Sequence, residues 1–166
     1  IPGIGKMKEG FDGKVAWAFN AMQGPQIKTG DEKATTAREA RFHSENWKED
    51  YRQVQTLGLE TVEGKPCYKI QLTPHSGAPS TNFYDRESGL LLKSIVTLKT
   101  AMGEITAESL PSDYRKVGGL LVPFRIVQKV AGQMMTMTFS SVENNAPIPR
   151  GTFDLPAEIQ ALVGKQ

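Results

Sequence analysis

Apolar and polar residues alternate along much of the second half of the chain, which is the pattern of strands that bury one face. Three stretches show this alternation most clearly. Their apolar members are Tyr68, Ile70 and Leu72; Val122, Phe124 and Ile126; and Met135, Met137 and Phe139. Because successive side chains of a strand point to opposite faces of a sheet, we expect these residues to form one apolar face. Leu92, in the stretch GLLLKS, is expected on the same face.

Six glycines divide this half of the chain into segments of similar length. They are Gly64, Gly77, Gly89, Gly103, Gly118 and Gly132, at intervals of 12 to 15 residues. One strand and one turn fill such an interval, and this regular spacing is typical of an antiparallel meander. The dipeptide Asp12-Gly13 predicts one more hairpin near the start of the chain.

Helices are predicted between these two regions, from residue 30 to residue 57. Thr29 and Glu32 fit the capping box that starts a helix. Three residues fall at i, i+4 and i+7 and would share a helical face: Trp47, Tyr51 and Val54. Gly58 is placed to end the helix. The preceding stretch, MQGPQIKTG, is expected to break regular structure because it contains Gly-Pro and a second glycine.

The fold class that follows is mainly β with α (α+β). A meander with one apolar face must curl or be covered to hide that face, and the helical region is the cover that the sequence offers. We therefore expect a curved antiparallel meander that forms an unclosed β half-barrel capped by helices, in a single domain of residues 1–166. The final stretch, FDLPAEIQALVG, predicts a last strand and a short helix.

Charge and cysteine content exclude several classes of partner and site. The 20 basic and 18 acidic residues leave a net charge of +2 and are interspersed, which argues against nucleic acid as a partner. The single cysteine, Cys67, excludes an internal disulfide and a multi-cysteine metal cluster. No apolar run approaches the roughly 20 residues that span a bilayer. The chain begins without a signal peptide, so we expect a processed or trimmed product.

Two acidic residues, Asp85 and Glu87, are the first candidates for catalysis. They precede Ser88-Gly89, where the chain must reverse, and turn formation alone explains this composition. No catalytic role is therefore predicted for them. A hydrolase that uses Asp85, Glu87 or Asp113 with Tyr114 is the least favoured of the functions considered.

The sequence offers no metal or cofactor site. His43 and His75 have no partner at the spacing of zinc ligands, so neither a metal nor a cofactor is expected. The surroundings of Cys67 in EGKPCYKI contain nothing that would activate a thiol, and Cys67 is interpreted as a small strand residue.

Four segments of the chain resemble a known family. In order, VEGKPCYKIQLTP, FYDRESGLLLKS, PSDYRKVGGLLVPFRIVQ and SVENNAPIPRGTFDLP are similar to the bacterial outer-membrane lipoprotein-sorting superfamily, the LolA-like and LppX-like carriers. The resemblance runs from Asp12 to Pro156. It implies an unclosed half-barrel whose concave apolar face holds acyl chains, in the periplasm or cell envelope and without enzymatic activity. It also implies that this chain lacks the family's N-terminal helix and first strands, which carry the basic residue that gates lipid entry.

The function expected from this resemblance is a non-enzymatic periplasmic or envelope domain that binds lipid or lipoprotein acyl chains, with envelope membrane proteins as possible partners. The residues expected to line the cavity are Tyr68, Ile70, Leu72, Leu92, Val122, Phe124, Ile126, Met135, Met137 and Phe139. Methionines adapt well to irregular apolar ligands, although core filling explains them equally. The alternative is a structural or protein-interaction module of the envelope in which the same residues are core.

Overall fold

The computed structural model describes residues 7–21, 23–41, 47–100 and 103–164, which form two compact units. Unit 1 comprises Ile1–Asp50 with Pro147–Gln166, and unit 2 comprises Tyr51–Ala146. The elements of unit 1 are β1 (Met7–Phe11), β2 (Ala16–Asn20), β3 (Gly24–Lys28), α1 (Gly30–Glu39), α2 (Trp47–Asp50) and α3 (Ala157–Val163). Those of unit 2 are β4 (Tyr51–Val62), β5 (Lys65–Pro74), β6 (Ser80–Asp85), β7 (Leu91–Thr100), β8 (Gly103–Val117), β9 (Leu120–Val130) and β10 (Gln133–Thr138).

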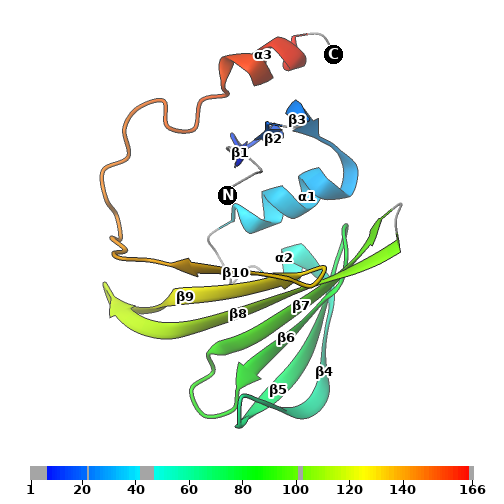
Figure 1. Ribbon diagram of the computed structural model, residues 1–166, viewed down its shortest axis with the longest axis vertical. Coiled ribbons are helices and arrows are strands. Elements are labelled where there is room, and N and C mark those ends of the chain that lie inside the picture. Colours follow the sequence, from blue (N-terminus) through cyan, green and yellow to red (C-terminus); the bar gives the residue numbers. More distant parts are fainter. Residues whose placement is uncertain (1–6, 22, 42–46, 101–102, 165–166) are drawn as a thin grey trace. The chain divides into compact units, whose positions relative to one another are not determined.

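In unit 1, a three-stranded antiparallel sheet in the order β1-β2-β3 lies between α1 and α3 (Figure 1). The predicted hairpin at Asp12-Gly13 is confirmed, because Asp12 Oδ1 accepts hydrogen bonds from the backbone N–H groups of Lys14 and Val15 at 2.8 and 2.7 Å. Ile159 of α3 is 1% exposed and anchors this helix. On β1, any side chain at Gly10 would displace the ring of Trp17, since a Cβ there would lie 2.8 Å from it.

Three predictions for unit 1 differ from the structure, two of them only in part. The stretch MQGPQIKTG contains β3 rather than irregular backbone, because β3 is an edge strand and edge strands tolerate proline. The residues before α3 form a turn rather than a last strand, although the terminal helix itself is confirmed. Thr29 occupies the N-cap position of α1 as predicted, but its side chain makes no capping hydrogen bond.

Unit 2 is one antiparallel sheet in which every strand pairs with the next along the chain, in the order β10-β9-β8-β7-β6-β5-β4 (Figure 1). The sheet is curved, and its two outer strands, β4 and β10, do not pair with each other. The predicted fold class, an antiparallel meander that forms an unclosed half-barrel in a mainly β chain, is therefore confirmed. The described residues of unit 2 contain no helix, so the sheet has no covering layer within its own unit.

The predicted helix is wrong beyond Asp50. Helix α2 ends there, and Tyr51–Val62 is β4, which pairs with β5 along its length. Val54, placed on a helical face by its spacing from Tyr51, instead stands opposite Leu72 of β5. The pairing shifts register between Tyr51 and Gln53 and again between Thr56 and Gly58, so Gly58 follows an irregularity of a strand rather than the end of a helix. Long-range pairing has overridden a weak local pattern.

The buried core of unit 2 is small and surrounds Phe83. Val62, Cys67 and Phe83 form its main cluster, with Leu92 and Ile95 packed against them. Phe124 and Val127 are buried outside this cluster. Phe83 is 1% exposed and Cys67 is fully buried. Burial raises the pKa of the Cys67 thiol, which agrees with the prediction that this cysteine is an inert strand residue.

Two lysines cover the ring of Phe83. Lys69 and Lys93 are its register neighbours on β5 and β7, and their Nζ atoms lie 5.6 and 5.7 Å from the ring centre. Lys69 also pairs with Glu60 at 2.9 Å, and Lys93 with Glu108 at 3.2 Å. Cation–π contacts and long aliphatic stems thus close this side of the sheet over its core. We call it the Phe83 face.

Candidate functional site

The register of the sheet places most of the predicted lining residues on the face opposite Phe83. A row of direct cross-strand neighbours joins Ile70 of β5 to Met135 of β10, through Asn82, Ser94, Ser109 and Gln128. Tyr68 and Leu72 flank Ile70 along β5, and Ile126 of β9 stands opposite Met137 of β10. Neighbours in register project to the same side. We call the face that carries these six predicted residues the Ile70 face: Tyr68, Ile70, Leu72, Ile126, Met135 and Met137.

Three other predicted residues lie at one end of β9 and β10. Val122 and Phe124 continue the alternation of β9 from Ile126. Phe124 is buried, and the guanidinium of Arg115 lies 4.5 Å from the centre of its ring. Phe139 directly follows β10, donates its backbone N–H to the carbonyl of Phe124 at 2.9 Å, and keeps an exposed side chain. By this alternation, β9 continues the Ile70 face beyond Ile126 to Phe124 and Val122.

Leu92 is the predicted residue that the structure separates from the others. It lies where the pairing of β6 with β7 shifts register: Phe83 stands opposite Lys93, and Tyr84 stands opposite Leu91. Its side chain packs against the buried cluster around Phe83. The structure thus brings Leu92 to the core of unit 2.

Much of the Ile70 face is open to solvent. Tyr68 is 43% exposed and Met135 is 40% exposed, while Ile70, Leu72, Ile126 and Met137 are half-buried. Leu59, which stands opposite Tyr68 on β4, is 58% exposed. The face is therefore apolar at both ends of the row and accessible there.

Four polar residues on this face were missed in the sequence. They are the central members of the row that joins Ile70 to Met135: Asn82, Ser94, Ser109 and Gln128. Asn82 is buried and the other three are half-buried. Each comes from a different strand, and only the cross-strand register places the four side by side.

Asp85 occupies the tip of the β6–β7 hairpin, as predicted. Its backbone N–H donates to Leu90 O and its carbonyl accepts from Gly89 N, both at 2.8 Å. Its carboxylate accepts a hydrogen bond from the Ser88 hydroxyl at 2.6 Å and one from the backbone N–H of Glu87 at 3.3 Å. The hydrogen bond from Ser88 makes the largest contribution to lowering the pKa of Asp85. The carboxylate is held ionised to form the turn.

The hydrogen bond between Ser88 and Asp85 should make the free energy of unfolding depend on pH. Because the pKa of Asp85 is lower in the folded state, its contribution is present at neutral pH and is lost as pH falls through the folded pKa. We expect Ser88→Ala to raise the pKa of Asp85 and to lower stability at pH 7, whereas the two proteins should converge at an acid pH where Asp85 is protonated in both. Urea unfolding at the two pH values checks this. A constant difference at both pH values would contradict it.

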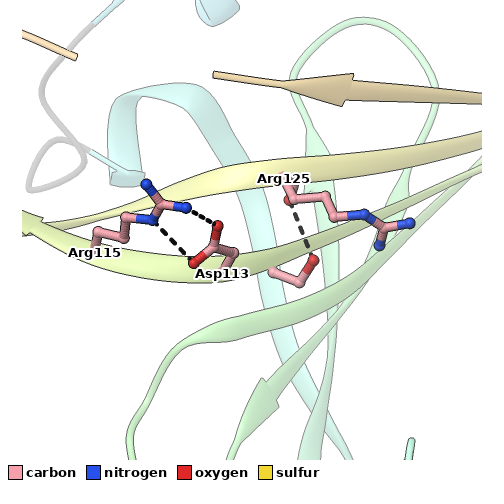
Figure 2. A network of polar contacts seen from close by, with 4 residues as sticks. Asp113, Arg115 and Arg125 are labelled. Carbon is pink, nitrogen blue, oxygen red and sulfur yellow. Dashed lines mark hydrogen bonds and ion pairs between the residues drawn. The ribbon is translucent and has the colours of Figure 1, made fainter. Parts of the chain in front are cut away.

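The side chains of Asp113 and Tyr114 also form hydrogen bonds within unit 2. Figure 2 shows Arg115 bound to Asp113 through two nitrogens, with Nε 3.0 Å from Oδ1 and Nη2 2.6 Å from Oδ2. This pairing lowers the pKa of Asp113. The hydroxyl of Tyr114 donates to Leu91 O at 2.7 Å, and burial raises its pKa. An ionised aspartate tied to arginine and a tyrosine tied to a carbonyl are poorly suited to proton transfer.

Other predicted features concern metals and membranes. His75 is exposed, and His43 lies outside the described residues. Within the described ranges, no group of three or more His, Cys, Asp or Glu side chains is arranged to hold a metal ion. None of the helices described is long and apolar enough to cross a membrane.

A cleft of about 780 Å³ lies entirely within unit 1. It borders β1, the C-terminal part of α1 and residues 152–154. Its lining mixes the aromatic rings of Phe11, Trp17 and Phe153 with the carboxylates of Glu39 and Asp154. None of the residues predicted to bind a ligand contributes to it.

Comparison with known proteins identifies the family and the fold. Residues 21–159 match the family model described as a domain of unknown function (DUF4412). No curated protein matches the sequence. The crystal structure of a DUF1329 family protein from Desulfovibrio piger is similar with a TM-score of 0.59 and 13% identity, over 89% of this chain and 66% of that one.

A second solved structure leads to the same fold. The LolA superfamily protein from Nitrosomonas europaea has a TM-score of 0.58 and 17% identity, over 86% of this chain and 67% of its own. The present chain thus spans about two thirds of the length of both solved proteins. The fold is LolA-like, and because the family model covers most of the sequence, the chain belongs to the DUF4412 family.

Proposed function

We propose that this protein is a non-enzymatic domain of the periplasm or cell envelope that binds a lipid or the acyl chain of a lipoprotein on its Ile70 face. The LolA-like fold and the resemblance found in the sequence support this class of function. Envelope membrane proteins that deliver or receive the cargo are the further partners of the proposal.

One observation carries the proposal: the Ile70 face gathers apolar side chains from both ends of the sheet and leaves several of them exposed. Leu59 and Tyr68 form one exposed pair on β4 and β5, and Met135 is exposed on β10. Proteins rarely expose contiguous apolar surface unless it serves in binding. An acyl chain is a suitable occupant of such a surface, because it is itself apolar.

The driving force would be the removal of hydrocarbon from water. Each CH₂ group buried contributes about 0.8 kcal/mol, so a chain only partly covered would still bind measurably. Met135 and Met137 are unbranched and flexible, and they can follow an irregular chain. Binding without enclosure also permits release, which a carrier requires.

Two adjacent methionines provide the test. Met135 lies on the Ile70 face, whereas Met134 stands opposite Lys129 on the Phe83 face and is 70% exposed. We expect Met135→Glu to weaken the binding of a fluorescent fatty acid at least tenfold, because it places a charge on the apolar surface. Met134→Glu is the matched control and should change affinity by less than about twofold, since the new carboxylate faces water and Lys129.

Equilibrium titration with the fluorescent fatty acid, followed by displacement with unlabelled oleate, measures both variants. Circular dichroism checks that each is folded; β10 is an edge strand, where substitutions are well tolerated. Absence of saturable binding at micromolar wild-type protein would favour a structural or interaction module instead. Equal loss of affinity in both variants would move the site away from the Ile70 face.

A further inference from the structure

The cleft of about 780 Å³ in unit 1 follows the outer edge of β1. Among the described strands, β1 pairs only with β2, and it does so without a register shift. Consecutive residues of β1, from Lys8 to Phe11, line the cleft. Because successive side chains of a strand point to opposite faces, a cleft that contacts all of them must follow the edge of the strand. We call it the β1 cleft.

Part of the backbone of β1 points into this cleft. Asp12 donates its backbone N–H to Val15 O at 3.3 Å, which makes these two residues a hydrogen-bonded pair. In antiparallel strands such pairs alternate with pairs that exchange no hydrogen bond. By this alternation Gly10 bonds to β2, whereas the N–H and C=O groups of Glu9 and Phe11 point away from β2. An edge that presents its backbone groups in this way is a template for one more strand.

One wall of the β1 cleft is the C-terminal part of α1. Lys28 fixes this helix against the sheet, because its Nζ donates to Thr36 Oγ1 at 3.0 Å and to Glu9 Oε2 at 2.8 Å. Phe11 lies two residues from Glu9 on the same strand and therefore points to the same face. Glu39, three residues after Thr36 on α1, lines the cleft on this side.

The other side of the cleft is aromatic. Trp17 stands opposite Gly10, and a Cβ at Gly10 would lie 2.8 Å from its ring, so the indole lies across β1 at this glycine. Trp17 also borders Ile159 of α3 in a small neighbouring cavity, which places it on the α3 face of the sheet. Phe153 is 65% exposed and adds a second ring, and Asp154 adds a carboxylate.

The charges that line the β1 cleft favour a cationic occupant. The carboxylate of Glu9 is already paired with Lys28. Those of Glu39 and Asp154 are exposed and form no ion pair with any residue that the structure describes. Lys8 is the one cation among the lining residues, and it lies at the other end of β1 from Phe11. The lining is therefore net negative.

We propose that the β1 cleft binds an extended segment of a partner protein in which basic and apolar residues alternate. The segment adds antiparallel to β1 as a fourth strand, and its backbone bonds to Glu9 and Phe11. Residues directly opposite each other project to the same face. The basic side chains therefore lie on the α1 face near Glu39, and the apolar side chains lie on Trp17 and Phe153. This site is separate from the Ile70 face and goes beyond the proposed function.

The test uses a fluorescein-labelled peptide of seven residues that alternates lysine with valine and spans β1 with one residue beyond each end. Fluorescence anisotropy measures its binding to the wild-type protein. Methylating the backbone nitrogens of the lysines removes the N–H groups that face β1 and should weaken binding at least tenfold. Methylating those of the valines is the matched control, since these N–H groups point away from β1, and should change affinity by less than about threefold.

Variants of the protein test the charges of the cleft. Glu39→Gln combined with Asp154→Asn removes the two unpaired carboxylates and should weaken binding of the unmethylated peptide about fivefold, because pairs at an exposed rim are modest in strength. Glu32→Gln combined with Glu143→Gln changes the net charge equally outside the lining and should alter affinity by less than about twofold. Circular dichroism checks that both variants are folded.

The outcomes separate this inference from the proposed function, since fatty-acid titration does not depend on the β1 cleft. Equal effects of the two methylated peptides would show that charge alone holds the peptide and would overturn strand addition. Lack of binding at millimolar peptide overturns the whole inference. Dimerisation of the wild-type protein that the peptide reverses, measured by sedimentation, would assign the edge to a second copy of the chain and overturn the proposed partner.

Discussion

Replacing Phe83 with alanine is expected to lower the free energy of unfolding of unit 2 by about 3–5 kcal/mol. Phe83 is 1% exposed and is the largest side chain of the small cluster with Val62 and Cys67. Its loss leaves a cavity that two charged neighbours, Lys69 and Lys93, cannot fill, because their ammonium groups would have to leave water. This is the largest effect of a single substitution that we expect in unit 2.

The only cysteine of the chain makes this measurement specific. Cys67 is fully buried in the same cluster, so a thiol reagent labels it when unit 2 opens. We expect labelling of Phe83→Ala to be faster by a factor of at least about 100, which corresponds to a loss near 3 kcal/mol. Phe139→Ala is the matched control, because its side chain is 39% exposed and should matter by less than about 1 kcal/mol. Similar labelling rates for both phenylalanine variants would show that Phe83 is not central to the core.

The second large effect is expected in unit 1, where Ile159→Ala should lower the free energy of unfolding by about 2–4 kcal/mol. Ile159 is 1% exposed and is the one buried residue of α3 among those described. Both tryptophans of the chain, Trp17 and Trp47, belong to unit 1, so urea unfolding followed by tryptophan fluorescence reports this unit. Val163→Ala, on the same helix but 38% exposed, is the control and should cost less than about 1 kcal/mol.

The two probes together test whether the chain unfolds as a single domain, as the sequence predicts. If it does, Phe83→Ala will shift the tryptophan transition and Ile159→Ala will accelerate the labelling of Cys67. If each substitution affects only the probe in its own unit, the two units unfold separately. If the urea unfolding transition followed by tryptophan fluorescence were the same in Ile159→Ala as in the wild-type protein, the anchoring role of this isoleucine would be contradicted.

The meander of unit 2 could be predicted from the sequence because its signals are local. Alternation sets the faces within each strand, and turn glycines such as Gly64, Gly89 and Gly132 mark the reversals with a positive φ. The turn at Asp85 could be predicted for the same reason, since a turn is made by residues adjacent in sequence. Local chemistry was sufficient for these elements.

Long-range pairing accounts for what could not be predicted. The stretch that begins β4 satisfies both a helical and an extended pattern, and only its pairing with β5, which places Val54 opposite Leu72, decides between them. The row of four polar residues on the Ile70 face has the same origin. Neither Ser109 nor Gln128 stands out within its own strand, and no spacing along the chain aligns them. Cross-strand register is a property of the assembled sheet.

The two register shifts of β4 have a consequence for self-association. β4 is twelve residues long, almost entirely exposed and paired on one side only, so it would be a template for another copy of the chain. A docking strand would need a regular ladder, and the shifts between Tyr51 and Gln53 and between Thr56 and Gly58 interrupt it twice. At its β4 edge, the sheet therefore offers another copy of the chain no continuous ladder on which to add a strand.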